Sequence, residues 1–246
     1  MILAPRLNYP VTTYWGRVLA DNPVAFWPMT ETAGGVVYDI TGHGNTGTVN
    51  GSLTMGQSGP PLLGLSQPAF HFDGSSAYIS VSTSAVEGLA SNGTLSLEVW
   101  INPSTLTTTN PDNSGENGPG LFATNNNGGS TGYDWGLKTN GQFWWWPSSG
   151  NDRYSTNVLS TNNWYHLVLV VSAGSTVIMY INGIEDSSQS NTGQGAGSFF
   201  SIGGPGWIAG YFAGWMCNAA IYNTALSSQQ VAAHYATAHT GPVGIS

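Results

Sequence analysis

Positively charged residues are scarce in this sequence. Its 246 residues include four Lys and Arg against twelve Asp and Glu, a formal net charge of −8. A protein that binds nucleic acid or anionic lipid by neutralising phosphates needs a basic surface. We therefore expect neither nucleic acid nor a membrane surface among the partners.

Cysteine and long apolar runs are also lacking. The single residue Cys217 excludes an intrachain disulfide and a multi-cysteine zinc site, and its apolar neighbours indicate a small buried side chain. No run approaches the roughly 18 apolar residues of a membrane span, so membrane insertion is not expected. The first residues also lack the basic and then apolar pattern of a secretory signal.

Short β-branched and aromatic runs separated by Gly, Asn, Ser and Thr clusters fill most of the chain. This pattern predicts an all-β fold, a two-sheet antiparallel jelly-roll sandwich. One short C-terminal helix is expected over 227–239, with Ser227 as its N-cap, and one helical turn over 16–21. We predict an extended N-terminal arm over 1–15, one domain over 16–240 and a tail over 241–246.

The arm is unusually apolar for a terminal segment. Large side chains that are unfavourable in water recur along it, so it must pack on its own domain or on a neighbour. We favour the neighbour, another virion protein or another copy of this chain. The expected assembly residues are Leu3, Leu7, Tyr9, Tyr14 and Trp15.

Several segments, in order along the chain, resemble the concanavalin A-like, laminin-G-like jelly-roll superfamily. They are Val18–Trp27, Asp39–Gly47, Phe72–Gly74, Leu95–Pro103, Trp164–Val168, Tyr180–Gly183 and Gly214–Ser227. The resemblance implies the same sandwich, found in lectins, glycosidases and virion proteins alike, so it does not decide function. One departure stands out: Met216-Cys217-Asn218 occupies the place where family members usually carry Ile-Asp-Glu.

Catalytic signals are weak. Glycosidases need two facing carboxyl groups, but Glu98 stands alone in its strand, and the adjacent Glu185 and Asp186 point to opposite faces if extended. His166 lies in a strand without a nucleophile motif, which indicates a hydrogen-bonded structural histidine. We expect a protein that is not an enzyme.

The loop over 39–47 is a candidate calcium site. Calcium prefers clustered oxygens, and the candidate ligands are Asp39, Asn45 and Asp73, the last implied by the resemblance. The acidic residues missing at 217 and 218 weaken this site. The alternative is an Asx-turn in which Asp39 caps its own loop. A structural calcium ion is the one cofactor considered.

The run Phe143-Trp144-Trp145-Trp146 is the sharpest aromatic signal. In a strand, Trp144 and Trp146 face one side and Phe143 and Trp145 the other, so only one pair belongs to the core. The second pair is covered by another segment or binds a sugar ring. The candidate carbohydrate-binding residues are Tyr133, Asp134, Trp135, Trp144, Trp146, Asp152 and Tyr154.

These features favour a non-enzymatic virion structural protein, a capsid decoration or tail-associated protein of a bacteriophage. It would display a lectin-like jelly roll that binds glycans at the host surface. The expected location is the virion. The alternative is an extracellular location, as a carbohydrate-binding module of a secreted bacterial protein. A glycosidase or lyase is the third hypothesis.

Overall fold

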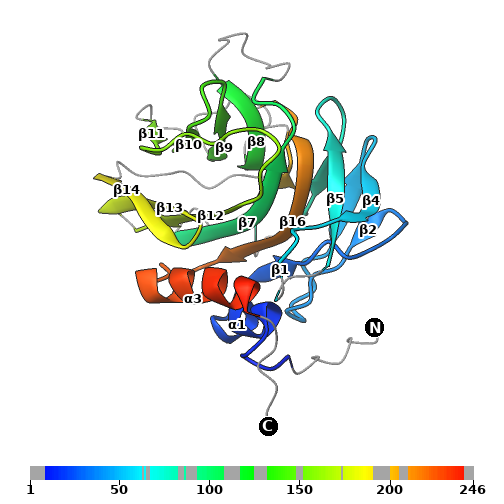
Figure 1. The fold of residues 1–246 in the computed structure, drawn as a ribbon, viewed down its shortest axis with the longest axis horizontal. Helices are drawn as coiled ribbons and strands as arrows, with labels where there is room; N and C mark the ends of the chain where they lie inside the picture. Colours follow the sequence, from blue (N-terminus) through cyan, green and yellow to red (C-terminus); the bar gives the residue numbers. More distant parts are fainter. Residues whose placement is uncertain are drawn as a thin grey trace.

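The computed structural model describes residues 9–62, 64, 67–82, 86, 93–107, 117–124, 132–147, 152–172, 174–190, 200–204 and 210–240. In this part, two antiparallel sheets pack face to face and two helices lie beneath the lower sheet (Figure 1). Neither helix has the length and apolar character needed to cross a membrane. The predicted all-β sandwich is confirmed.

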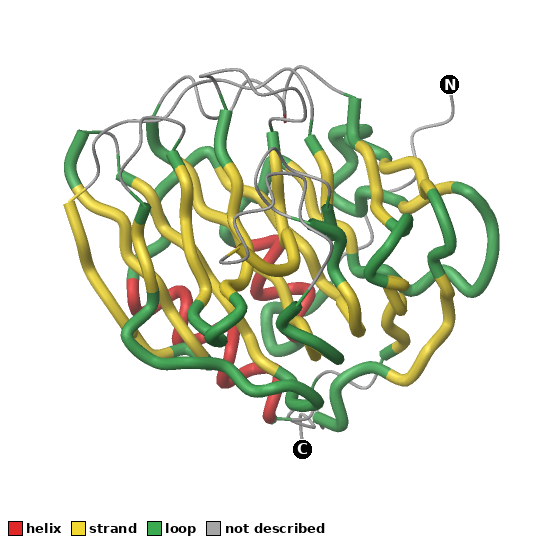
Figure 2. Tube along the Cα trace, turned by 90° about the horizontal axis from the view of Figure 1, so that it is seen from above, coloured by secondary structure: helices red, strands yellow, loops and turns green. Residues whose placement is uncertain are grey.

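Each sheet has eight described strands. In sheet A the order is β14 (Ile184–Ser190), β13 (Thr176–Ile181), β12 (Tyr165–Val171), β7 (Leu95–Pro103), β16 (Ala213–Tyr222), β5 (Pro68–Asp73) and β4 (Thr54–Ser58), and β1 (Ala25–Trp27) also pairs with β16. In sheet B it is β11 (Arg153–Tyr154), β10 (Phe143–Trp146), β9 (Asp134–Lys138), β8 (Asn117–Ala123), β15 (Ser201–Ile202), β6 (Tyr78–Ser80), β3 (Gly47–Asn50) and β2 (Val36–Val37). Figure 2 shows these strands side by side across the molecule, with the helices behind them.

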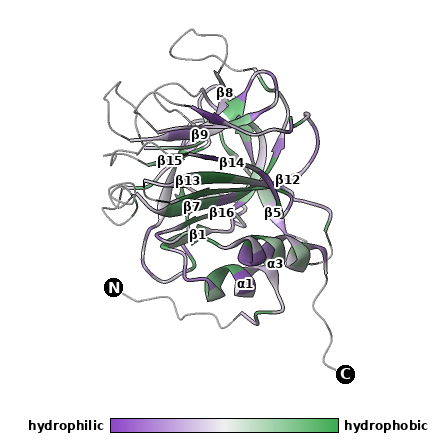
Figure 3. Cartoon of the chain, turned by 90° about the vertical axis from the view of Figure 1, so that its left-hand side faces the viewer, coloured by the Kyte–Doolittle hydropathy of each residue, from purple (hydrophilic) through white to green (hydrophobic). Residues whose placement is uncertain are grey.

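The core lies between the sheets. On β7, Leu97, Val99 and Ile101 are fully buried in it, as the alternation predicts. The opposite face of β7 is buried as well, because Glu98 and Trp100 lie against the helix layer. Figure 3 shows the hydrophobic residues concentrated along β7 and β13, in the middle of the molecule.

The C-terminal helix α3 (Ser228–His239) confirms the predicted helix. The Ser227 hydroxyl accepts a hydrogen bond from Gln230 N–H, and the Gln230 side chain accepts one from Ser227 N–H. This reciprocal capping box satisfies two backbone donors at the helix start. Val231 and His234, from the predicted packing stripe, are buried against sheet A.

The arm prediction is wrong at its C-terminal end. A helix, α1 (Tyr14–Ala20), begins two residues before the expected boundary because the Thr13 side chain caps Gly16 N–H. Tyr14 is 1% exposed in the core of its own domain. Leu3, Leu7 and the tail 241–246 lie outside the described residues.

Trp15 also packs on its own domain. Its indole N–H lies 2.7 Å from Gln67 Oε1 and 2.9 Å from Asn218 Oδ1, and the ring of Tyr9 meets it edge to face. Asn218 lies in a β-bulge of β16 with a φ of 53°. The departure from the family pattern at 216–218 thus supplies an amide that holds the N-terminal helix.

Candidate functional site

The outer face of sheet B is the face that points away from the core. Phe143 and Trp145 on β10 belong to the core cluster, whereas Trp144 and Trp146 alternate with them and lie on the outer side. Direct cross-strand partners share a face, so Tyr154 lies beside Trp144, and Asp134 beside Trp146. The alternation along the strand therefore predicts correctly that Phe143 and Trp145 lie on one face and Trp144 and Trp146 on the other.

Trp144 forms the support of this outer face. Its indole N–H donates to the Leu137 carbonyl oxygen at 3.0 Å, and it is fully buried. Its cross-strand partner is Gly136, where a Cβ would lie 3.3 Å from the Trp144 ring nitrogen and 2.7 Å from the Pro119 carbonyl oxygen. A side chain at position 136 would collide with the Pro119 carbonyl oxygen and press on the Trp144 indole, so glycine is needed for this packing.

The accessible part of the outer face is formed by Trp146, Asp152 and Tyr154, each half-buried. The Tyr154 hydroxyl donates to Asp152 Oδ2 at 3.0 Å, and the Lys138 ammonium lies 5.3 Å from the centre of the Tyr154 ring. Trp145 pairs with Arg153, so the next residues, Trp146 and Asp152, are on neighbouring chain segments at the same edge of sheet B. We call Trp146, Asp152 and Tyr154 the Trp146 patch.

The expected seven-residue patch is wrong for four of its members, which are fully buried. Tyr133 and Trp135 are fully buried in the core, where Trp135 stacks on Phe122 with ring centres 5.2 Å apart and Tyr133 lies 4.8 Å from Trp145. Rings enclosed in this way have no face for a sugar. Trp144 and Asp134 are on the predicted face but are also fully buried, so they support the Trp146 patch from below.

A second polar cluster surrounds Glu98 between sheet A and the helices. Its carboxylate is fully buried and accepts hydrogen bonds from Tyr14 Oη at 2.9 Å, Tyr222 Oη at 2.8 Å, His166 Nε2 at 2.8 Å and His234 Nδ1 at 2.9 Å. His234 Nε2 in turn donates to Asp21 Oδ2 at 2.8 Å. We call these six residues the Glu98 cluster.

The Glu98 cluster holds ionised groups in the interior. Burial opposes ionisation of Glu98, but the charge of His234 and hydrogen bonds from both histidines hold the pKa of Glu98 well below its usual range. Burial likewise opposes charge on His234, yet Glu98 and Asp21 raise its pKa to about 9. Burial lowers the pKa of His166. At neutral pH a charged His234 therefore bridges two carboxylates, and His166 is a neutral donor.

Stability should depend on pH through this cluster. The pKa of Glu98 and that of Asp21 are lowered, so their contribution is lost as the pH falls below about 4. The pKa of His234 is raised, so its contribution is complete below about pH 6.5 and is lost as the pH rises through about 9. The pKa of His166 is lowered, so its contribution is lost as the pH falls below about 6.5. We expect the free energy of unfolding, measured by urea titration, to be highest near pH 6.5 and to decline on both sides.

The alkaline decline has its own control. His234→Gln should remove the decline between pH 6.5 and 9, whereas His43→Gln, at an exposed loop position, should leave it in place. A flat profile over this pH range in the unchanged protein would contradict the assignment.

Sequence reasoning identified His166 as a hydrogen-bonded structural residue, and the structure confirms this. It did not identify the partners, because Tyr14, His166, Tyr222 and His234 lie 68 to 136 positions from Glu98, and Asp21 lies 213 positions from His234. The available signal was the polar residue Glu98 at an alternate position of an otherwise apolar strand. Such a residue is buried only where partners surround it.

The candidate calcium ligands are fully engaged within their own turns. The Asp39 carboxylate accepts hydrogen bonds from the backbone of Phe26, Thr41 and Asn45 and from the Thr41 hydroxyl. The Asn45 amide donates to the Val24 carbonyl oxygen. These donors compete with a cation for the same oxygens, and the Thr41 N–H to Asp39 contact is the Asx-turn of the alternative prediction.

Asp73 is engaged in the same way. Its carboxylate accepts five hydrogen bonds, from the N–H groups of Ser75, Ser76 and Ala77 and from both serine hydroxyls. These hydrogen bonds outweigh the effect of burial and lower the pKa of Asp73. The described residues contain no group of three or more His, Cys, Asp or Glu side chains placed to hold a metal ion. The donor set does not fit calcium.

Removal of divalent cations should therefore leave stability unchanged. Excess chelator is expected to shift the Tm by less than about 1 °C, because a ligand stabilises a fold only when it binds the native state. The measurement is a thermal melt with chelator and with added calcium. A rise in Tm that depends on calcium and disappears in Asp39→Asn would contradict this assignment.

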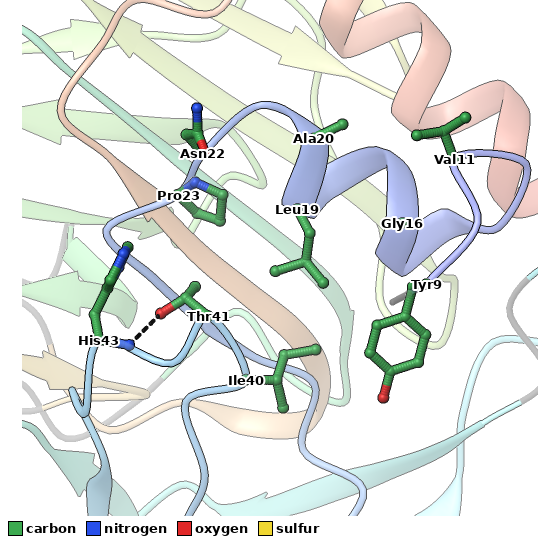
Figure 4. A pocket seen from close by; sticks show the side chains of 10 residues that line it. All are labelled: Tyr9, Val11, Gly16, Leu19, Ala20, Asn22, Pro23, Ile40, Thr41 and His43. Carbon is green, nitrogen blue, oxygen red and sulfur yellow. Dashed lines mark hydrogen bonds between the residues drawn. The ribbon is translucent and has the colours of Figure 1, made fainter. Parts of the chain in front are cut away.

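A pocket lies between α1 and the 39–43 loop (Figure 4). Its volume is about 490 Å³, and Leu19 and Ile40 line it opposite Tyr9. The polar groups of the loop are already used: Thr41 Oγ1 accepts from His43 N–H, and His43 Nδ1 lies 3.0 Å from the Val24 carbonyl oxygen. We therefore place the candidate site at the Trp146 patch.

Comparisons with known proteins agree with this architecture. Domain 4 of AbnA, an extracellular GH43 arabinanase from Geobacillus stearothermophilus solved in complex with arabinotriose, superposes with a TM-score of 0.63 at 22% identity, covering 87% of this chain and 98% of that domain. A structure of botulinum neurotoxin type C, whose cell entry depends on interaction with two ganglioside molecules, gives a TM-score of 0.65 at 11% identity. That match covers 91% of this chain and 53% of the other.

The sialidase of Trypanosoma rangeli gives a TM-score of 0.60 at 16% identity, covering 86% of this chain and 32% of the enzyme. This chain thus spans about half of the toxin structure and a third of the sialidase. At these identities, the likeness shows the fold alone. No curated protein sequence matches the chain. The family model of the concanavalin A-like lectin/glucanases superfamily, Laminin_G_3, matches residues 73–232, and the chain belongs to this family.

Proposed function

We propose that this chain is a non-catalytic glycan-binding module and that the Trp146 patch is its binding surface. The observation that carries the proposal is the half-exposed indole of Trp146 on the face of sheet B away from the core, with Asp152 and its hydrogen-bond partner Tyr154 on the neighbouring segment. A planar aromatic ring stacks on the C–H face of a sugar, and a few polar groups then fix its orientation. The arabinotriose complex of the arabinanase domain supports the same class of ligand.

The arrangement of carboxylates supports binding without catalysis. Glu98 is enclosed by its four donors and has no exposed surface. On the outer face of sheet B, Asp134 is fully buried, so Asp152 is the carboxylate of the Trp146 patch that a ligand can reach. A glycosidase needs two carboxyl groups that both reach the scissile bond, roughly 5–9.5 Å apart.

The two described ends lie on the other side of the molecule from the Trp146 patch. The described chain begins at Tyr9 beside α1 and ends at Thr240 after α3, and both helices lie on the far side of sheet A from sheet B (Figure 1). A carrier joined at either end would leave the Trp146 patch open. This geometry suits a virion protein and a module of a secreted protein equally.

The virion location stays a prediction, and its support from the arm is reduced because Tyr14 and Trp15 dock on their own domain. Co-sedimentation of the purified chain with particles tests it.

Replacing Trp146 by Ala should abolish most of the binding. We expect at least a tenfold increase in the Kd for a glycan identified on an array, because the stacking surface is removed, and a Tm change of only a few degrees, because the ring is half-exposed. Calorimetry measures the Kd. Tyr38→Ala is the matched control, since Tyr38 is a 60% exposed aromatic at the opposite edge of sheet B. Unchanged affinity in Trp146→Ala would contradict the proposed surface.

A further inference from the structure

We propose that the Trp146 patch takes an uncharged glycan and discriminates against sialylated, sulfated and uronic acid sugars. The proposal rests on the function proposed above and specifies its ligand class. It is carried by the positions of the cationic side chains of this chain. The structural relatives do not decide between a neutral and an anionic glycan, since arabinotriose is neutral and gangliosides carry sialic acid.

An anionic sugar needs a cation or several N–H donors aimed at its carboxylate or sulfate. The chain has four Lys and Arg residues: Arg6, Arg17, Lys138 and Arg153. Arg6 lies outside the described residues, and Arg17 is on α1, beyond sheet A. Arg153 pairs with the core residue Trp145, and its guanidinium donates to the carbonyl oxygens of Ser190 and Asp152.

Lys138 is the remaining cation. It is on the outer face of sheet B but is only 8% exposed, with its ammonium held above the Tyr154 ring. It therefore presents little charge to a ligand. The guanidinium fork that binds carboxylates in two hydrogen bonds is absent from the described part of this face.

Histidines do not supply the missing charge. His166 and His234 are in the buried Glu98 cluster, and His43, His71 and His239 are on the 39–47 loop, β5 and α3. Four further sequence segments lead into strands of sheet B and hold no Lys, Arg or His either. They are 108–116, 125–131, 148–151 and 191–199. Whatever their positions, these segments add no positive side chain.

Negative charge is present on the same face. Asp152 belongs to the Trp146 patch, and Asp134 lies next to Trp146 across the strands. The chain as a whole carries a formal net charge of −8. Asp152 offers an acceptor to sugar hydroxyls and repels an anionic substituent at the distance of direct contact, and the buried Asp134 adds negative potential beneath it. The face therefore favours polyhydroxylated, uncharged rings.

The test is a glycan array containing neutral oligosaccharides together with their sialylated, sulfated and uronic acid counterparts, followed by calorimetry on matched pairs. We expect the neutral member of each pair to bind at least tenfold more tightly at low salt. Asp152→Asn should reduce the ratio of the two Kd values, anionic to neutral, severalfold, because it removes one repelling charge and keeps an acceptor for Tyr154. Glu185→Gln makes the same charge change at an exposed position on β14 and should leave the ratio unchanged.

The outcomes separate this inference from the function on which it rests. Tighter binding of the anionic members, lost at high salt and in Lys138→Gln, would overturn the inference and leave glycan binding in place. Equal binding of both members, unaffected by Asp152→Asn, would overturn it as well. Binding to no member of the array would contradict the proposed function itself, and the inference with it.

Discussion

Replacing Glu98 by Gln is expected to lower the free energy of unfolding by about 3–5 kcal/mol, the usual effect of removing one partner from a buried ion pair. For a domain of this size, that corresponds to a fall in Tm of about 10 °C. The substituted amide would offer one carbonyl acceptor in place of two charged oxygens. Several of the four donors would then lose a partner, and the charge of His234 would lose one of its two counterions.

Thermal and urea unfolding measure this effect. Glu185→Gln, on the exposed strand β14, changes the same functional group and should alter the Tm by no more than about 1 °C. If the Glu98→Gln protein had the same Tm as the unchanged protein, the Glu98 cluster would not be a source of stability. The expected loss also bears on function, because an acidic residue in a glucanase-like fold invites a catalytic role. Here the structure assigns it to the packing of two helices on a sheet.

The sandwich was predictable because strand alternation and turn residues act locally. The apolar positions of β7 and the capping box of α3 follow from residues within a few positions of each other. The same alternation separated Trp144 and Trp146 from Phe143 and Trp145. Which pair would lie in the core depended on how sheet B packs on sheet A, a long-range property that one strand does not encode.

The errors have the same physical origin. Tyr133 and Trp135 fit a binding patch by residue type, but the core of the sandwich encloses both rings. Asp39 and Asp73 fit calcium by composition, and the structure shows their oxygens accepting nearby N–H groups; that calcium does not bind there stays a prediction. Tyr14 was assigned to an arm because its partner Glu98 lies 84 positions away. In each case the residue type indicates which contacts a side chain can make, and packing against residues distant in the sequence decides which contacts it does make.

Truncation should show how closely the N-terminal segment belongs to the domain. Removal of residues 1–8 leaves every contact described here in place, so the Tm should stay within about 2 °C. Removal of residues 1–15 should lower the free energy of unfolding by several kcal/mol. It deletes the buried ring of Tyr14, worth about 1.5–3 kcal/mol, and the Thr13 cap, worth about 1 kcal/mol. It also removes one donor from Glu98 and the hydrogen bonds of Trp15.

Comparing the two truncated proteins by urea unfolding also tests assembly. If residues 1–15 were a docking arm alone, the shorter protein would unfold with unchanged midpoint and lose only its association with particles or with other copies, as measured by co-sedimentation and light scattering. If helix α1 belongs to the domain, the protein lacking 1–15 unfolds at lower urea, whereas the protein lacking 1–8 does not. Loss of association on removal of residues 1–8, with stability retained, would restrict the assembly role to Leu3, Leu7 and their neighbours.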